Sequence, residues 1–386
     1  MRHFDTIVAG LGAMGSATAA HLALRGQRVL GLERWAPGHG FGSSHGDSRI
    51  IREMYFEHPM YVPMVQRAFA LWRELEERSG ASLLHVAGGL MLGPADGALV
   101  AGTLRSAREH RLEHEVLSAG DVRARFPAFE PRETDVAVFD PHAGWLAPEK
   151  CNAAHLEVAR AHGAELHYLE PVVRWAIDGD GVRVHTPRET YVADRLVVSA
   201  GARTGSLLPG LALPLTVERQ LLFWLDPPAG DARYDSPACP IYIHEFDRGV
   251  FCYGFPRLAR GAKAAVMHRG EVVSDADLVR RDVRDDEVEP LRRALAGVLP
   301  GLAQAPVRES GVCLFTNTPD EHFVVDFHPA HPQVLVSSAC SGHGFKFASA
   351  IGELQADLLT DATPRFDPSP FRIGRFASPE ANATAR

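Results

Sequence analysis

The sequence predicts an α/β protein in which a second domain, built on mixed or antiparallel sheet, is inserted into a Rossmann-like dinucleotide-binding domain. A buried strand at residues 4–10 runs into the pattern Gly10-Leu-Gly12-Ala-Met-Gly15 at the start of a helix. A second buried strand, glycine loop and helix follow at 334–359. Between them, residues 217–310 change to short alternating strands with many prolines, a pattern typical of antiparallel sheet.

The first 80 residues are expected to open the nucleotide-binding domain. An alanine-rich helix is predicted over 16–25 and a strand over 28–33. Residues 34–48 are rich in Gly, Ser and His, which predicts a loop. Apolar residues at helical spacing predict a helix over 61–79, with Gly80 as its stop signal.

The later elements follow from the same periodicities. We expect short strands with one helix at 85–145, a helix at 151–163, a strand at 191–201, a charged amphipathic helix at 276–298, a helix at 345–359 and an irregular tail after residue 361. These elements suit two interleaved domains, as expected for 386 residues. The nucleotide-binding domain would comprise 1–80, 146–216 and 311–386, and the substrate-binding domain 81–145 and 217–310.

Composition excludes several classes of protein. Hydrophobic residues make up 46% and charged residues 23%, a globular balance, and the net charge of −8 argues against a nucleic-acid binder. No apolar run is long enough for a transmembrane helix, and a strand pattern from Phe4 leaves no room for a signal peptide. Five cysteines form neither a CxxC pair nor a disulfide framework, so we expect a cytoplasmic protein.

The glycine motif is the first candidate binding site. Gly10 allows the tight turn, Gly12 lets a pyrophosphate approach the backbone, and Gly15 lets the helix lie close to the sheet. The helix N-terminus attracts phosphate, and Glu33 stands where an acid accepts ribose hydroxyls. A glycine turn without a ligand is the alternative. The motif leaves NAD(P) and FAD equally open.

Two further segments carry polar side chains in glycine-rich surroundings. The first is Gly42-Ser-Ser-His-Gly-Asp-Ser-Arg-Ile-Ile-Arg52, which could wrap a phosphate, a flavin edge or a carboxylate, or be a solvated loop with surface ion pairs. The second is Ser341-Gly-His-Gly-Phe-Lys-Phe347, which offers an anion site at a helix start or an ordinary surface lysine.

Single residues add weaker signals. The chain has only three lysines, Lys150, Lys263 and Lys346, so a retained lysine suggests a need for an ammonium with a movable pKa. Cys313 lies in a strand pattern and by itself is more typical of buried filler. Histidines at 322, 328, 331 and 343 match no metal-ligand spacing, so no metal site is expected.

Taken together, four motifs resemble one family, the monomeric sarcosine oxidases and N-methyl-tryptophan oxidases. They are Gly10–Gly15, SSHGDSRIIR at 43–52, CLFTNTPDEHF at 313–323 and SGHGFKF at 341–347, in the right order over nearly the whole chain. The tail at 366–376 is most similar to the N-methyl-tryptophan oxidases. The resemblance implies a glutathione-reductase-type FAD domain and FAD as the cofactor.

The resemblance implies a role for individual residues. Cys313 corresponds to the cysteine joined by a thioether to the flavin 8α carbon, and His45 and Arg49 to residues against the flavin ring. Arg52 and Lys346 correspond to the pair that grips the substrate carboxylate. Lys263 corresponds to the lysine that activates oxygen on the other flavin face. The remaining cofactor contacts would be Gly10, Gly12, Ala13, Met14, Gly15, Glu33, Arg34, Ser43, Ser44, Ser48, Gly342, Gly344, Phe345 and Lys346.

Departures from the family pattern concern the substrate side. Phe315 stands where a tyrosine is common, and His268 follows Lys263 one residue later than expected. Tyr242, His244 and Tyr253 are expected to line the substrate cavity, with Tyr253 and Phe315 in contact with the substrate.

The implied activity is that of a monomeric oxidase of secondary amino acids. A hydride would pass from the carbon beside a neutral amine to flavin N5, and O2 would then be reduced to hydrogen peroxide. Sarcosine, other N-methyl amino acids, cyclic imino acids such as pipecolate or proline, and larger amines all remain possible substrates. A dehydrogenase with another electron acceptor is a second class, and an NAD(P)-dependent reductase or a flavin scaffold without turnover is a third.

Overall fold

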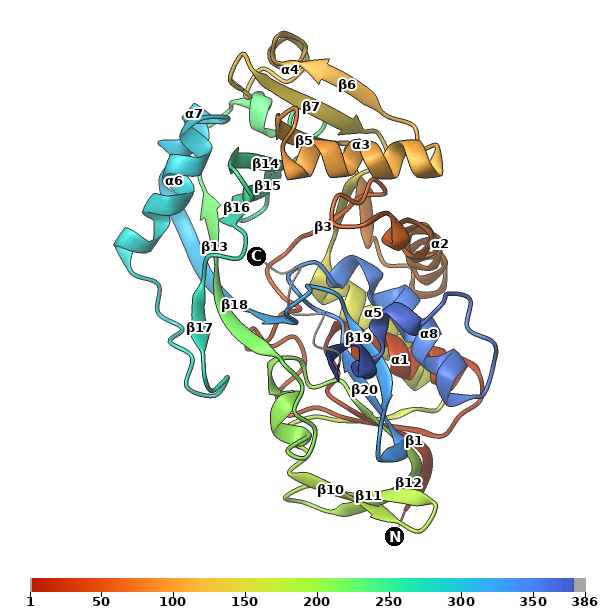
Figure 1. Ribbon diagram of the computed structural model, residues 1–386. Coiled ribbons are helices and arrows are strands. Elements are labelled where there is room, and N and C mark those ends of the chain that lie inside the picture. The colour runs from red at the N-terminus through yellow and green to blue at the C-terminus, as the bar shows by residue number, and fades with distance from the viewer. Residues whose placement is uncertain (1, 378–386) are drawn as a thin grey trace.

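The computed structural model describes residues 2–377 and arranges them around two large sheets (Figure 1). In the first, the spatial order β9-β2-β1-β12-β20 is parallel throughout, and a β10–β11 hairpin and β19 extend it in antiparallel fashion. Its strands are β1 (His3–Ala9), β2 (Val29–Leu32), β9 (Glu165–His167), β10 (Arg174–Asp178), β11 (Gly181–His185), β12 (Thr190–Val198), β19 (Val324–His328) and β20 (His331–Ser338).

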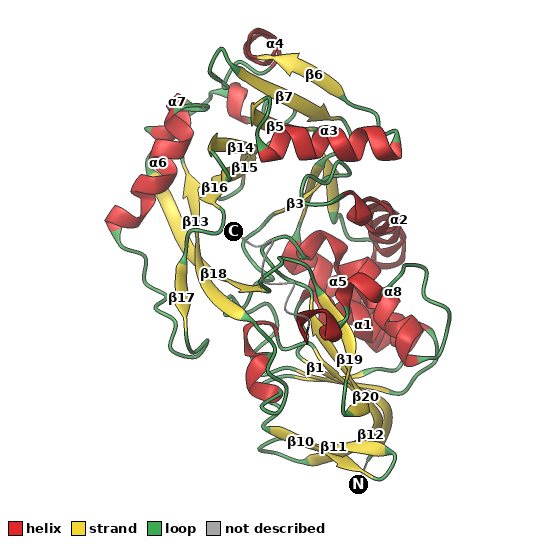
Figure 2. Ribbon diagram, in the orientation of Figure 1, coloured by secondary structure: helices red, strands yellow, loops and turns green. Residues whose placement is uncertain are grey.

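Long helices gather beside this sheet (Figure 2). Helix α1 lies against α5 and α8, and α2 lies against the same two helices. They are α1 (Ala13–Leu24), α2 (Val62–Ser79), α5 (Pro148–Ala161) and α8 (Ala348–Leu359). Parallel strands joined through helices that cover the sheet are the arrangement of a dinucleotide-binding domain, so the predicted fold class is confirmed.

The second sheet is mixed, with one parallel pair, β14 with β5, among antiparallel neighbours. Its order is β17-β13-β16-β15-β14-β5-β7-β6, and β18 pairs with β13. The strands are β5 (Gly89–Pro94), β6 (Glu115–Ser118), β7 (Asp135–Asp140), β13 (Thr216–Leu225), β14 (Ile241–Asp247), β15 (Val250–Leu258), β16 (Gly261–Val266), β17 (Glu271–Val273) and β18 (Val307–Asn317).

Both faces of this second sheet are covered. Helices α6 (Glu289–Ala296) and α7 (Pro300–Ala303) share a hydrophobic cluster with the outer face, and α3 (Ala98–His110) lies on the opposite face. Because β18 pairs with β13 over most of its length, the sheet continues past residue 311, where the sequence placed a domain boundary. A small sheet of β3 (Arg49–Ile51), β8 (Gly144–Leu146) and β4 (Leu84–Val86) completes the strands.

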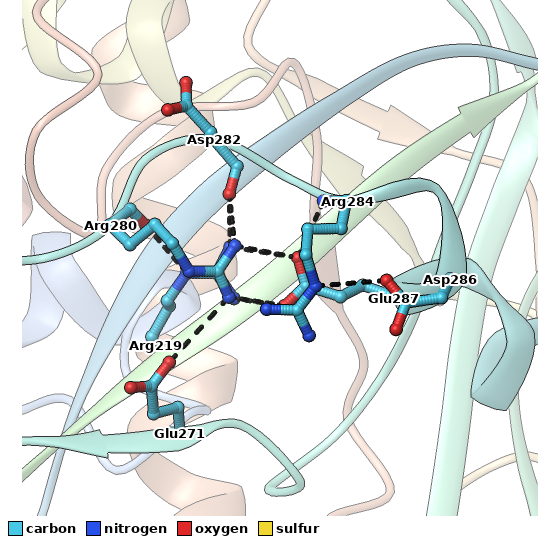
Figure 3. Close-up of polar contacts among 7 residues, drawn as sticks. All are labelled: Arg219, Glu271, Arg280, Asp282, Arg284, Asp286 and Glu287. Atoms are coloured by element: carbon cyan, nitrogen blue, oxygen red, sulfur yellow. Dashed lines mark hydrogen bonds and ion pairs between the residues drawn. The ribbon is translucent and has the colours of Figure 1, made fainter.

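The helix expected at 276–298 is wrong over its first half. Residues 274–284 are irregular, and the helical part is a 3-10 turn at Asp285–Val288 followed by α6. The charges instead serve a tertiary network (Figure 3): the buried Arg219 guanidinium donates to the Glu287 carboxylate at 2.8 Å and to the backbone carbonyls of Arg280 and Asp282.

Two smaller differences concern helices. Residues 85–145 contain α4 (Ala119–Arg125) as well as α3, because Ser118 and Asp121 form a capping box at its start. The tail is irregular as expected, with 3-10 turns at Ser369–Phe371 and Ile373–Ala377, and it is tied to β19 by the Ile373 amide, which donates to Asp326 at 2.8 Å. The end of the predicted tail lies outside the described residues.

Candidate active site

A cavity of about 710 Å³ lies between the two large sheets and takes its wall from both. On one side are residues at or just past the carboxyl ends of the parallel strands, namely Ala9, Leu32, Ser199 and Ser338. This edge is where open parallel sheets bind nucleotides. On the other side are side chains from β14, β15 and β18, so the two sheets together form one site.

The glycine turn has the predicted geometry. Gly10 has a φ of +96°, and a Cβ there would stand 2.4 Å from the Ser199 carbonyl oxygen. A Cβ on Gly15 would stand 1.8 Å from the carbonyl oxygen of Gly10, so the helix can lie this close only with glycine. Gly12, Ala13 and Met14 line the cavity, whereas Gly15 supports the turn from behind.

Glu33 and Arg34 follow β2 at the cavity wall. The buried Glu33 carboxylate accepts from the backbone amides of Leu11 at 2.9 Å and Trp35 at 3.0 Å. Burial raises the pKa of Glu33, but His39 and these two amides outweigh it and hold the pKa below its usual value. Glu33 is therefore an anion that fixes the glycine turn, and Arg34 forms an ion pair with Asp277 at 3.0 Å.

The segment at 42–52 is not a solvated loop. Ser43 donates to the carbonyl of Leu314 and Ser44 accepts from the Ala13 amide at 3.0 Å, so the segment joins β18 to the start of α1. Ser43 and Ser44 line the cavity, while Ser48 is fully buried behind them. The alternative with surface ion pairs is wrong because this segment is built into the interface between the sheets.

Arg49 and Cys313 meet at the cavity wall. The Arg49 guanidinium lies 3.6 Å from the Cys313 sulfur and donates to the Ser43 carbonyl at 3.0 Å. Cys313 is buried on β18. His45 lies beside Arg49, and burial, then the Arg49 charge, lowers its pKa to about 3, so its ring is neutral. The Nε2 of His45 has no partner among the described residues.

Arg52 and Lys346 both line the cavity and both are almost fully buried. The Arg52 guanidinium donates to both Glu57 carboxylate oxygens at 2.7 Å, and the Lys346 ammonium donates to the His343 carbonyl at 2.7 Å. Burial, then the Arg52 charge, lowers the pKa of Lys346 to about 7. Glu57 was missed by the sequence reasoning because its surroundings, Glu53-Met-Tyr-Phe-Glu57, match no binding motif.

The remaining wall near these cations is largely apolar. Tyr253 and Phe315 line it as predicted, together with Ile243 and Met267, which the sequence did not single out. The expectation for Tyr242 and His244 is wrong. Their side chains alternate with Ile243 and point to the outer face of the sheet, where Tyr242 packs against Phe129 with ring centroids 5.4 Å apart.

His268, which follows Lys263 one residue later than expected, comes directly after a residue of the cavity wall. Met267 stands at the cavity wall, and His268, with a φ of +49°, turns behind it. The His268 ring lies 3.7 Å from the Glu218 carboxylate and 5.4 Å between centroids from Phe315. Met267 therefore lines the wall, while the His268 ring packs against Phe315.

The segment at 341–347 closes the cavity from the side of α8. Gly342, Gly344 and Phe345 line it with Lys346. A Cβ on Gly344 would stand 1.9 Å from the Ala339 carbonyl oxygen, and Gly342 has a φ of +74°. Both glycines are thus required by the tight turn between β20 and α8.

Lys263 is buried but does not line the cavity. Its ammonium donates to the carbonyls of Gly46, at 2.6 Å, and Ser48. Burial, then the charge of Arg49, lowers its pKa well below the usual value. Lys263 thus binds the segment at 42–52 from β16, through the backbone on both sides of Asp47.

The described residues fit a bound dinucleotide. The α1 N-terminus, the Glu33 carboxylate and a cavity that passes between the sheets suit its phosphates, ribose and ring system. The buried Ser338 hydroxyl lines the cavity and lacks a partner among the described residues, as a polar contact for a ligand would. Within residues 2–377 no three potential metal ligands cluster, and no helix has the length and apolarity to cross a bilayer.

Comparison with known proteins identifies the family of this chain. The family model described as DAO, FAD dependent oxidoreductase, matches residues 5–358. A monomeric sarcosine oxidase of Streptomyces avermitilis is 46% identical, covering 95% of this chain and 97% of the relative. An N-methyl-L-tryptophan oxidase of Salmonella arizonae is 34% identical, covering 97% and 99%.

Solved structures show the same fold. NikD, an amino acid oxidase of nikkomycin biosynthesis in its open form, is 25% identical with a TM-score of 0.83, covering 96% of this chain and 98% of that one. Glycine oxidase from Geobacillus kaustophilus, at 22% identity, has a TM-score of 0.82, covering 97% and 99%. The resemblance drawn from the four motifs is confirmed: this chain belongs to the DAO family of FAD-dependent oxidoreductases, in the group of the monomeric sarcosine oxidases and N-methyl-L-tryptophan oxidases.

Proposed function

We propose that this protein is an FAD-dependent oxidase of N-methyl amino acids. The reaction converts an N-methyl amino acid, O2 and water into the amino acid, formaldehyde and hydrogen peroxide. Bound FAD supplies the hydride acceptor and passes both electrons to O2. The names of the relatives, sarcosine oxidase and N-methyl-L-tryptophan oxidase, support this substrate class.

The observation that carries the proposal is the pair Arg52 and Lys346. Two buried cations face the same cavity, and among the described residues Glu57 is the one carboxylate that contacts either of them, through Arg52. A carboxylate ligand would add the negative charge that these two groups lack. An amino acid held by its carboxylate in this way would be fixed in one orientation, and orientation contributes strongly to hydride transfer.

The rest of the wall favours a neutral amine. Ile243, Tyr253, Met267 and Phe315 bring no charge to it. An ammonium in this position would lie near two cations, Arg52 and Lys346, and the adjacent Glu57 carboxylate is already paired with Arg52, so the uncharged amine is the form that binds. The apolar wall also leaves room for a substituent larger than hydrogen, so a cyclic imino acid such as proline or pipecolate is the second candidate substrate.

We further infer that the flavin is attached to Cys313. The sulfur faces the cavity from β18, and Arg49 lies 3.6 Å away, where a guanidinium stabilises a thiolate. Ser43 links Arg49 to the strand that carries Cys313. Its carbonyl accepts from Arg49, and its hydroxyl donates to the carbonyl of Leu314. Thioether formation would use the thiolate as the nucleophile, would remove one hydrogen from the flavin 8α methyl group as a proton, and would leave the flavin reduced by two electrons for O2 to accept. Arg49 is the residue proposed to assist it by stabilising the thiolate.

Lys263 is the residue proposed for the reaction with oxygen. Its ammonium is within electrostatic reach of Arg49 and Cys313, which lie at the cavity wall. A fixed cation beside the redox centre would stabilise negative charge as O2 is reduced. An amine dehydrogenase with another acceptor is the competing function, and it predicts that Lys263 has no effect on the reaction with oxygen.

The proposed working form is a cytoplasmic monomer. The five cysteines are all free thiols, as is usual in a reducing compartment. The word monomeric in the names of the sarcosine oxidase relatives supports one chain per molecule. Light scattering on the purified holoprotein tests this, and a dimer mass would overturn it.

The substrate class can be tested by anaerobic reduction of the bound flavin. Sarcosine, N-methyl-alanine, proline and pipecolate are each mixed with the holoenzyme while the absorbance of oxidised flavin is followed. The matched control is an N-methyl amine without a carboxylate, such as N-methylethylamine. We expect bleaching by the N-methyl amino acids only. Equal bleaching by the amine without a carboxylate would refute the proposed role of Arg52 and Lys346.

A further inference from the structure

The turn at Gly46-Asp47-Ser48 has an uncommon backbone. Asp47 has a φ of +64° and follows Gly46, whose φ is +97°. A left-handed backbone conformation is unfavourable for every residue except glycine, and it is least unfavourable for aspartate and asparagine. Such a conformation persists only when the surroundings hold it. Contacts of Asp47 and its neighbours must therefore hold this turn in place.

Two neighbouring strands of the second sheet reach this turn with adjacent side chains. Lys263 of β16 stands opposite Trp224 of β13 in the ladder. The Lys263 ammonium donates to the carbonyls of Gly46 and Ser48, the residues on either side of Asp47. The Trp224 indole N–H donates to the Asp47 carboxylate at 3.1 Å. Lys263 thus binds backbone carbonyls of the turn, and Trp224 binds the carboxylate of Asp47.

A third group holds the same carboxylate. Arg260 donates to the other Asp47 oxygen at 3.1 Å, and its guanidinium lies 3.9 Å from the centroid of the Trp224 ring. Glu149 accepts from the amides of Gly46 and Asp47, at 2.5 Å and 3.3 Å, from the opposite side. The turn is therefore held through the Asp47 carboxylate, the amides of Gly46 and Asp47, and the carbonyls of Gly46 and Ser48.

We propose that Asp47 is a positioning residue for the reaction with oxygen: by holding the turn at 46–48 through Trp224 and Arg260, it keeps the two carbonyls in place that fix the Lys263 ammonium. This inference rests on the proposed role of Lys263. Asp47 acts through the turn and has no direct hydrogen bond to the ammonium.

The electrostatics point in the same direction. Burial and Arg49 lower the pKa of Lys263, while the negative charges of Asp47 and Glu149 raise it. Two carbonyl acceptors stabilise the charged ammonium more than the neutral amine, because hydrogen bonds from a charged donor are stronger. If the turn rotated, the ammonium would lose its acceptors and its fixed position together.

The test separates the two half-reactions by stopped flow. The holoenzymes of Asp47→Ala, Asp47→Asn, Trp224→Phe and Lys263→Met are compared with wild type, first for anaerobic flavin reduction by substrate, then for reoxidation by O2. Asp226→Asn is the matched control, because it removes a carboxylate paired with Arg308 on the same sheet and leaves the turn at 46–48 intact.

We expect Asp47→Ala to slow reoxidation by about tenfold or more while flavin reduction stays within about twofold. Asparagine tolerates the left-handed conformation and keeps an oxygen for the Trp224 N–H, so Asp47→Asn should recover most of the rate. Trp224→Phe should slow reoxidation less than Asp47→Ala because Arg260 still holds the carboxylate. The control should react as wild type.

A wild-type reaction with O2 in Asp47→Ala, or an equal decrease in both half-reactions, would overturn the inference. If Asp47→Ala does not fold, Trp224→Phe decides, and wild-type reoxidation in that variant overturns it as well. Lys263→Met separates this outcome from the proposed function. A slow Lys263→Met beside a normal Asp47→Ala refutes Asp47 alone, whereas a normal Lys263→Met refutes the role of Lys263.

Discussion

Lys346 and Arg52 are two cations that the protein keeps almost entirely away from water. Burying a charge is costly unless it is paired, and here Glu57 pairs with Arg52 while Lys346 relies on a carbonyl and the Tyr55 hydroxyl. A group in this state gains from any anion that reaches it. Its protonation also becomes sensitive to pH near neutrality, since burial has brought the Lys346 pKa down to about 7.

A carboxylate ligand should therefore bind more weakly as the pH rises. Only protonated Lys346 attracts the ligand, so above pH 7 the affinity of the holoenzyme for propionate should fall by up to about tenfold per pH unit. Propionate has no amine of its own to titrate. The dissociation constant is measured from the change in flavin absorbance between pH 6 and pH 9.

Lys346→Arg is the matched variant for this measurement because arginine stays charged over the whole range. Its propionate affinity should not change with pH. Lys346→Ala should bind propionate at least about tenfold more weakly at pH 6, since hydrogen bonds to charged groups contribute about 1.5–3 kcal/mol. A pH-independent affinity in the wild type would contradict the proposed clamp.

Cys313 offers a test that needs no kinetics. The holoprotein is denatured in acid, and the yellow colour should stay with the polypeptide if the thioether has formed. Cys313→Ser should release its FAD under the same treatment, and Arg49→Lys should retain less covalent flavin than the wild type because it loses the planar donor beside the sulfur. A colourless wild-type polypeptide would refute attachment at Cys313.

At the scale of elements, the segment at 274–288 illustrates what periodicity misses. Its charges suggested one amphipathic helix, yet Glu287 of this segment pairs with Arg219, which lies buried on β13. A network that joins residues about 60 positions apart leaves no trace in a local pattern. The helix therefore starts only where Pro290 occupies its first turn.

The Arg219–Glu287 pair should contribute measurably to stability. The Arg280 hydrogen bond, opposed by burial and aided by Arg219, lowers the pKa of Glu287 below its ordinary value of 4.5. Because the folded pKa is the lower one, the contribution is complete above about pH 4.5 and is lost as the pH falls further. Glu287→Gln should lower the free energy of unfolding by about 3 kcal/mol at pH 7.

The measurement is urea unfolding of both proteins at pH 7 and at pH 4. The difference between wild type and Glu287→Gln should shrink at the lower pH. Glu289→Gln is the control, because this neighbouring carboxylate is 61% exposed and an exposed pair contributes at most about 1 kcal/mol. A difference that grew toward pH 4 would contradict the sign of the shift.

The sequence also did not show which face of a strand lines the cavity. The glycine turn after β1, Glu33, the 42–52 segment and the 341–347 turn were all predictable, because each needs particular residues at fixed spacing. Tyr242 and His244 were assigned to the wrong face because helices cover both sides of the second sheet and both sides of β14 are buried. Alternation then says which residues share a face, but not which face lines the cavity.

For the whole molecule, the site exists only where the two sheets meet. Ser44 near the first sheet, Cys313 on β18 and Lys346 before α8 come together across most of the chain, and no local pattern predicts that distance. The resemblance to a family predicted that these distant residues belong to one site. The chain nevertheless differs from that pattern at Phe315, where a tyrosine is common, and at His268, which follows Lys263 one residue later than expected.

The proposed reaction is the oxidation of an N-methyl amino acid by O2 in this cavity of the FAD-bound enzyme. The most direct measurement follows O2 consumption, hydrogen peroxide and formaldehyde together while the holoenzyme turns over sarcosine and N-methyl-alanine, with the amine-free propionate as blank. We predict equal amounts of all three for at least one substrate. Turnover that consumes an artificial electron acceptor and no O2, or peroxide without formaldehyde, would contradict the account.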